Sequence, residues 1–166
     1  IESCNILSYN DWIEMKESLI EKYLPADYSD RFTRRIKTGK KIEPGDLLTG
    51  MFGMTPGWVN VLMKIRNMIV KPFGIKSGNL GTEFSKTVNE QNDDEAVIGM
   101  DNKHLEFHVS VGVFAVEENE QEITVTTVVK YHNTLGRLYF FMVFPFHKII
   151  VPVMTDRVIA KIIIKK

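Results

Sequence analysis

The sequence predicts an α+β fold in which a curved antiparallel sheet wraps around one long C-terminal helix. Two observations support this. Residues 96–133 contain three strand-like segments in succession, joined by turn residues. After them, an apolar strand, Leu138–Phe144, leads through Pro145 into an apolar helical pattern that continues to the C-terminus. A sheet that ends in such a helix can close around it and enclose a pocket.

The length and charge of the chain further limit its domain organisation and its possible partners. With 166 residues, the chain is expected to form a single domain over residues 1–166, with residues 1–25 as an N-terminal helical extension. Lys plus Arg equals Asp plus Glu at 21 each, so we expect no nucleic-acid partner. The single cysteine, Cys4, cannot form an intramolecular disulfide, which agrees with a cytoplasmic location.

The N-terminal quarter is predicted to contain one helix and one strand. Apolar residues recur at helical spacing over Asn10–Leu24, and Pro25 ends that helix. The next segment, Tyr28–Ile36, mixes apolar residues with charged ones and is predicted to be an edge strand. A homodimer built through this exposed edge is one of the hypotheses for function.

Two shorter helices are expected next. The first covers Glu43–Phe52, where Pro44 suits a first helical position, and the second covers Pro56–Lys71, where Pro56 follows the capping residue Thr55. The polar segment from 76 to 94 is predicted to be mainly loop with one short strand.

The three successive strands are predicted at Ala96–Met100, His104–Val116 and Glu122–Asn133. Residues of the second strand alternate, and those expected on the packed face are Leu105, Phe107, Val109, Val111 and Val113. The opposite face carries Glu106, His108 and Ser110 and is expected to be solvated.

Leu138–Phe144 lacks this alternation, so both faces of this fourth strand should be covered. Pro145 then opens the terminal helix, and Pro152 bends it unless the helix begins nearer Val151. No membrane span is expected, because the apolar run is interrupted by His147, Lys148, Asp156 and Arg157.

Four strings, taken in order and spacing, carry a resemblance to a known family. They are Pro56-Gly57-Trp58 leading to Ile65-Arg66-Asn67 and Gly74; Asp101-Asn102-Lys103-His104-Leu105; Val128-Val129-Lys130-Tyr131-His132-Asn133 with Gly136-Arg137-Leu138-Tyr139; and Pro145-Phe146-His147-Lys148-Ile149-Ile150. From about Ala26 to its C-terminus, the chain resembles the bacterial family known as domain of unknown function 2867, a member of the START-like superfamily, also called SRPBCC.

The resemblance implies the helix-grip fold, in which two shorter helices close one side and a cavity lies between the sheet and the long helix. Members of the wider superfamily bind lipids, sterols and polyketide-like molecules, and some are cyclases or hydratases. We therefore expect a small hydrophobic ligand in an internal pocket. The residues expected to line it are Trp58, Leu62, Phe107, Tyr131, Tyr139, Phe141 and Met154.

Polar residues that are candidates for a functional role are fewer than the residues expected to line the pocket. Arg66 and Asp101 are expected at a charged rim that orients a ligand head group. His104, Glu106 and His147 are the candidates for acid–base catalysis. His147 is expected in the first helical turn, where a neutral ring would donate to a strand carbonyl and fix the junction.

No metal and no cofactor are expected. His104 and His108 on one strand lie about 14 Å apart, too far to share an ion. The chain also lacks a glycine-rich dinucleotide fingerprint. The functional hypotheses are thus a hydrophobic-ligand-binding domain, a cyclase or dehydratase that uses the same pocket with His104 or Glu106 as base, and a non-enzymatic interaction domain.

Overall fold

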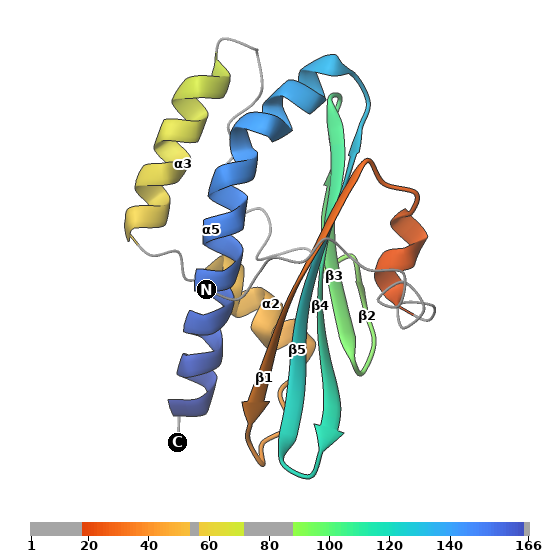
Figure 1. Ribbon diagram of the computed structural model, residues 1–166, viewed down its shortest axis with the longest axis vertical. Coiled ribbons are helices and arrows are strands. Elements are labelled where there is room, and N and C mark those ends of the chain that lie inside the picture. Colours follow the sequence, from red (N-terminus) through yellow and green to blue (C-terminus); the bar gives the residue numbers. More distant parts are fainter. Residues whose placement is uncertain (1–17, 54–56, 72–87, 165–166) are drawn as a thin grey trace.

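The computed structural model describes residues 18–53, 57–71 and 88–164. Their elements, in chain order, are η2 (Leu19–Tyr23, a 3-10 helix), β1 (Tyr28–Lys37), α2 (Pro44–Gly53), α3 (Gly57–Val70), β2 (Glu90–Gln91), β3 (Glu95–Asp101), β4 (Leu105–Glu117), β5 (Glu120–Tyr131) and α5 (Thr134–Ile164). The strands form one antiparallel sheet in the order β1-β5-β4-β3-β2. Helices α2 and α5 cover one face of the sheet and η2 covers the other (Figure 1).

The predicted α+β class is confirmed, with a five-stranded antiparallel sheet, a long C-terminal helix and two shorter helices. Every long strand of the sheet begins and ends within two residues of its predicted bounds. β1 is an edge strand, as its mixed composition indicates.

The prediction of a strand over Leu138–Phe144 is wrong, because α5 begins at Thr134 and includes this segment. Asn133 caps the helix, since its Oδ1 accepts a hydrogen bond from the backbone N–H of Gly136 at 3.0 Å. Gly136 and Phe140, one turn apart, are buried. The helix continues through both Pro145 and Pro152, and Figure 1 shows α5 changing direction in its first half, as expected of a helix with internal prolines.

The expectation that one face of β4 is solvated is also wrong. His108 and Ser110 are buried, and the ring of Tyr23 in η2 stacks on the His108 ring with centroids 3.5 Å apart. Ile20 of η2 packs with Val97 and Val128 on the same face of the sheet. Both faces of the central strands are therefore covered.

The N-terminal helix predicted over Asn10–Leu24 is described only from residue 18, where the chain forms the short 3-10 helix η2. Glu95 holds this helix to the sheet. At the start of η2, its carboxylate accepts hydrogen bonds from Ser18 Oγ at 2.8 Å and from the backbone N–H of Leu19 at 2.6 Å. It also accepts a hydrogen bond from Ser110 Oγ on β4. A nearly buried carboxylate thus anchors the segment that covers the second face.

The face covered by α2 and α5 carries two apolar clusters. The larger one joins α2 and the second half of α5 to the sheet, and includes Leu47, Ile98, Val111, Val125 and Met154. The smaller one, termed the aromatic cluster below, consists of Leu105, Val129 and Phe140 with Tyr28, Phe107, Tyr131, Tyr139 and Phe144 packed around them.

Among the described helices, α5 is long and apolar enough to cross a membrane, and 17% of its most apolar 18-residue stretch is buried. Two polar links tie this helix to β1. Arg34 donates two hydrogen bonds to Asp156, at 2.8 and 3.1 Å, and His147 contacts Asp30. These links are typical of a helix that packs on its own sheet.

Candidate functional site

A row of polar side chains separates the two apolar clusters on the face that α5 covers. Asp30 on β1 lies directly opposite Thr127 on β5 in the antiparallel register, so both side chains point to the same face. His147 reaches this row from α5, with Nε2 3.1 Å from Asp30 Oδ2. We call Tyr28, Asp30, Thr127 and His147 the polar row.

Asp30 is the centre of the polar row. Its side chain is 11% exposed and that of His147 is 15% exposed. The phenol of Tyr28 also donates a hydrogen bond to Asp30 Oδ2, at 2.7 Å. Burial raises the pKa of Asp30, but the hydrogen bond and charge of His147, together with Tyr28 and Lys148, outweigh burial and leave this pKa below its usual value. Asp30 is therefore an ionised acceptor inside a largely apolar layer.

Thr127 supplies the polar row with a hydroxyl group that could bind a ligand. The residue is 3% exposed, and its Oγ1 is buried with no hydrogen-bond partner among the described residues. Such hydroxyls are uncommon, because a buried polar group without a partner costs about 1–3 kcal/mol. A hydroxyl that can donate and accept is thus on the residue that pairs with Asp30 across the two strands.

The aromatic cluster borders the polar row and shares Tyr28 with it. Tyr28 packs against Phe140 and Phe144, with ring centroids 4.7 and 5.6 Å apart, and Tyr131 packs against Phe140 at 5.7 Å. Burial first, and then the charge of Asp27, raise the pKa of Tyr131, which keeps its phenol protonated. The combination of aromatic surface and a few convergent polar groups is typical of small-molecule sites.

The structure brings together part of the predicted pocket lining. Phe107, Tyr131 and Tyr139 are all in the aromatic cluster, whereas Met154 is buried in the larger cluster. Trp58 is 40% exposed on α3 and Phe141 is 74% exposed on α5. The side chains of two further candidates, Leu62 in the predicted lining and Arg66 in the predicted rim, are outside the described part of the chain.

The catalytic candidates lie apart from one another. Glu106 Oε1 accepts a hydrogen bond from His108 Nε2 at 2.9 Å, on the face of the sheet opposite Phe107. His104 lies in the turn before β4, where its Nδ1 is 3.3 Å from the side-chain amide of Asn133. His147 is in the middle of α5, so the expected position in a first helical turn is wrong, and it contacts the carboxylate of Asp30 instead of a strand carbonyl.

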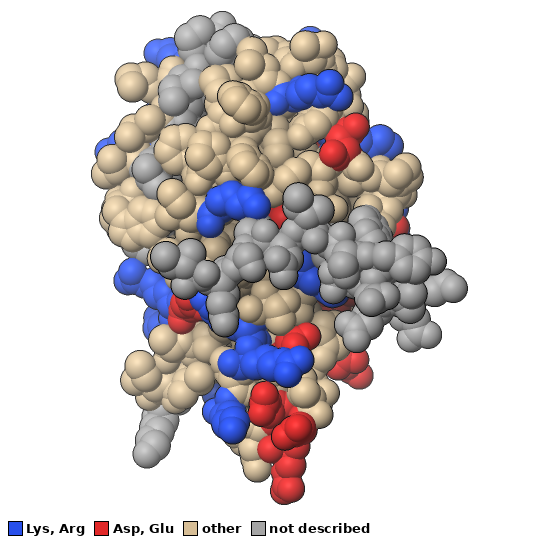
Figure 2. All heavy atoms as spheres, viewed as in Figure 1, with Lys and Arg blue, Asp and Glu red and all other residues tan. Residues whose placement is uncertain are grey.

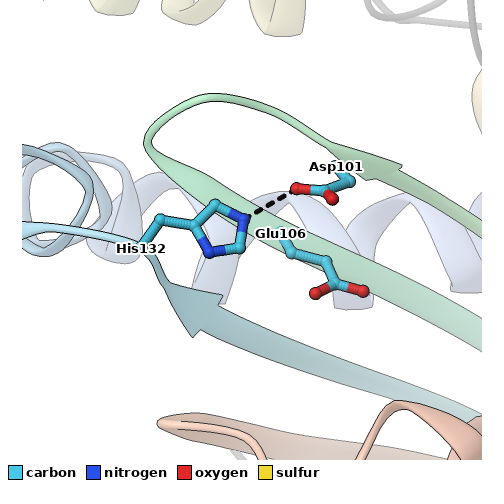
Figure 3. Close-up of side chains that lie close together, drawn as sticks. All are labelled: Asp101, Glu106 and His132. Carbon is cyan, nitrogen blue, oxygen red and sulfur yellow. Dashed lines mark hydrogen bonds and ion pairs between the residues drawn. The ribbon is translucent and has the colours of Figure 1, made fainter.

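Asp101, expected at the charged rim, lies at the end of the sheet (Figure 3). The side chains around it form a group separate from the polar row and the aromatic cluster. Asp101 Oδ1 is 2.7 Å from Nε2 of His132, and both residues are exposed. One ligating atom from each of Asp101, Glu106 and His132 lies within 4.8 Å of the others, a spacing that could hold a metal ion. The sequence argument considered His104, Glu106 and His108, which were predicted on one strand, whereas this set comes from three segments.

A hollow of about 270 Å³ lies at the other end of the sheet, beside the β4–β5 turn. It is half-open, and its lining includes Thr38, Ile42, Asp94, Asn119 and Gln121. None of the residues predicted to line a pocket contributes to it. This hollow therefore lacks the aromatic surface that surrounds the polar row.

Sequence reasoning missed Tyr28, Asp30 and Thr127 as site residues. Tyr28 and Asp30 were assigned to an edge strand without regard to the face on which they lie, although their i, i+2 spacing places both on one side. Thr127 breaks the apolar row that Ile123, Val125 and Val129 form on β5. A threonine inside such a row was the available signal.

No curated protein and no solved structure is significantly similar to this chain. One family profile matches residues 23–154, which include the polar row and the aromatic cluster. The match covers most of the chain and runs from the end of η2 to the second half of α5. The chain therefore belongs to the family described as protein of unknown function, DUF2867.

Proposed function

We propose that this protein is a START-like domain of the helix-grip type that binds a small hydrophobic molecule between its sheet and α5. The aromatic cluster would contact the apolar body of the ligand. The polar row would receive a hydrogen-bonding group of that ligand, such as a hydroxyl or a carbonyl. The single observation that carries the proposal is the buried hydroxyl of Thr127, which has no hydrogen-bond partner among the described residues and belongs to the residue paired with Asp30 across β1 and β5.

The arrangement favours binding over catalysis. Asp30 and His147 are already paired with each other, and Asp30 also accepts from Tyr28. Glu106, which the cyclase or dehydratase hypothesis would use as base, lies on the opposite face of the sheet from Phe107. A role in orienting a ligand therefore fits these residues better than proton abstraction.

The proposal is tested with the pair Thr127→Val and Thr126→Val. Both threonines are buried and adjacent on β5, but only Thr127 shares a face with Asp30. Native mass spectrometry of the purified protein identifies a co-purified small molecule, and displacement of a fluorescent apolar probe gives its affinity. Thr127→Val should weaken binding about tenfold, the loss expected for one hydrogen bond to a ligand.

Thr127→Val should leave the unfolding free energy of the ligand-free protein unchanged or higher, because it removes a buried hydroxyl without a partner. Thr126→Val should leave the affinity unchanged. Equal affinities for the parent and Thr127→Val would rule out a ligand at the polar row. Absence of any small molecule in the mass spectrum and of probe binding would rule out the proposed function as a whole.

A further inference from the structure

We propose that the outer surface of α3 and α5 docks on an anionic lipid membrane, with the helices lying in the membrane surface and not across it. We call this surface the helical face. The inference is independent of the ligand proposed above, since it involves side chains directed away from the sheet. It rests on exposed apolar side chains, on the charges of the two helices and on the contacts that hold α5 to the sheet.

Exposed apolar side chains are concentrated on these helices. Ten of the thirteen large apolar residues that are exposed in the described part of the chain belong to α3 or α5. On α3 they are Trp58, Val61, Ile65 and Met68, at a spacing of three or four residues that places them on one side of the helix. Met68 is 69% exposed and Val61 is 54% exposed.

A second stripe follows α5. Leu138, Phe141, Ile149 and Val153 are exposed, and Pro145 lies exposed between the second and third of them. Positions 138, 141, 145, 149 and 153 follow one side of a helix. Because α3 contacts α5, both stripes belong to one helical layer (Figure 1). Apolar patches of this kind on soluble proteins typically mark interaction sites.

The charges of this layer identify the partner. α3 and α5 contain six basic residues, Lys64, Arg66, Arg137, Lys148, Arg157 and Lys161, and one acidic residue, Asp156. Asp156 is paired with Arg34 of β1. The whole chain carries 21 basic and 21 acidic residues, so these two helices have a net charge of +5 and the rest of the chain has a net charge of −5. Figure 2 shows α3 and the upper part of α5 as mostly uncharged surface with some Lys and Arg, while the acidic groups lie mainly in the lower part of the view, together with further Lys and Arg.

An exposed apolar surface on two helices of net positive charge fits an anionic bilayer, where apolar side chains enter the interface and Lys and Arg meet lipid phosphates. Trp58 is suited to that interface, because an indole combines an apolar ring with a hydrogen-bond donor. A second copy of this face is disfavoured, since two such positively charged surfaces would repel each other. Crossing the membrane is disfavoured because α5 is joined to β1 through Asp30 and Arg34.

Co-sedimentation with lipid vesicles tests the proposal. Vesicles of phosphatidylcholine with roughly one-third phosphatidylglycerol should bind the protein, and binding should weaken at high salt, whereas pure phosphatidylcholine should bind it poorly. The chain has two tryptophans, so a Trp12→Phe background isolates Trp58, whose emission should shift to the blue on the anionic vesicles.

Two sets of variants separate the apolar and charged contributions. Val61→Asp with Ile65→Asp should lower the vesicle partition coefficient at least about tenfold, while Val116→Asp, an exposed apolar position on β4, should not change it. Lys64→Glu with Lys71→Glu, the second at the exposed lysine that directly follows α3, should lower it by at least about fivefold for each lysine replaced, while Lys40→Glu with Lys103→Glu, also exposed, should leave it unchanged. Circular dichroism confirms that each variant is folded.

Three results would overturn the proposal. One is equal binding to anionic and neutral vesicles, and another is an equal loss in the matched control variants. The third is a parent protein that does not bind vesicles and forms a dimer in light scattering, and whose dimer is converted to a monomer by Val61→Asp with Ile65→Asp. That result would assign the helical face to a second copy of the chain.

Discussion

His147 on α5 and Asp30 on β1 form a nearly buried pair, with 3.1 Å between His147 Nε2 and Asp30 Oδ2. The pair joins the long helix to the edge strand of the sheet. Asp30 is opposite Thr127 in the register of β1 and β5, and it accepts a hydrogen bond from Tyr28 of the aromatic cluster. The same contact therefore contributes to the stability of the fold and to the proposed ligand site, and the two contributions can be measured separately.

His147→Ala should lower the free energy of unfolding by about 1–3 kcal/mol, because it leaves the carboxylate of Asp30 buried without its main partner. Urea denaturation measures the change. His132→Ala is the matched control, since His132 also pairs with an aspartate but the two side chains are 33% and 68% exposed. Its cost should stay below about 1 kcal/mol, and equal costs for the two variants would contradict a special role for the buried pair.

The pH dependence of stability should carry the signature of Asp30. The pKa of this carboxyl is lowered in the folded protein from its ordinary value of 3.8, so the folded state favours the ionised form. The stability that ionised Asp30 contributes is thus complete above that ordinary value and is lost as the pH falls through the lower folded pKa. Asp30→Asn removes this dependence.

The comparison is made by thermal unfolding of the parent and Asp30→Asn across the acidic range. Their difference in stability should become smaller as the pH falls below 3.8. Other carboxyls with lowered pKa, such as Glu90 beside Lys22, are present in both proteins, so their contributions cancel in the difference between the two stabilities. A difference that stays constant down to the lowest accessible pH would show that Asp30 has an unshifted pKa.

The start of α5 should be sensitive to two substitutions of different kinds. Asn133→Ala removes the helix cap and should cost about 1 kcal/mol. Gly136→Ala should cost more, about 2–3 kcal/mol, because its new Cβ would lie 1.9 Å from the carbonyl oxygen of His104, a backbone atom. Gly53→Ala, where a Cβ would meet nothing within 4 Å, is the control and should cost little. Chemical denaturation measures the free energy of unfolding of the three variants and of the parent.

Glu95→Gln should loosen η2 without unfolding the sheet. The neutral amide is a weaker acceptor for Ser18 Oγ and the N–H of Leu19. Hydrogen exchange measured by mass spectrometry should be about tenfold faster in residues 18–24 and unchanged in β5. Glu118→Gln, at an exposed position in the β4–β5 turn, should leave both segments unchanged. Equal exchange in the parent and Glu95→Gln would show that η2 is held by its apolar contacts alone.

The sheet was predictable because alternation along β4 and β5 is a local signal that marks where each strand begins and ends. The start of α5 was mistaken because a continuous apolar run, such as Leu138–Phe144, is compatible with a covered strand and with a buried helix. The capping residue Asn133, three positions before Gly136, was the local signal that distinguishes the two.

The candidate site was less predictable, for a physical reason. His147 was singled out, but its partner Asp30 lies 117 residues away in the sequence, and Thr127 reaches the same row only through the register of β1 and β5. In the same way, the burial of His108 depends on Tyr23, which comes from another element. Alternation shows that two side chains share a face but not which other segment covers them.

The contacts at both ends of the described chain extend the folding unit beyond the residues that the family profile matches. The matched segment begins at residue 23 and ends at residue 154. Ile20, which packs on Val97 and Val128, precedes it, and Val158 and Ile159, which belong to the larger apolar cluster, follow it. A protein trimmed to residues 23–154 would lose apolar contacts on both sides of its sheet, so a stable fragment of this chain should retain these flanks.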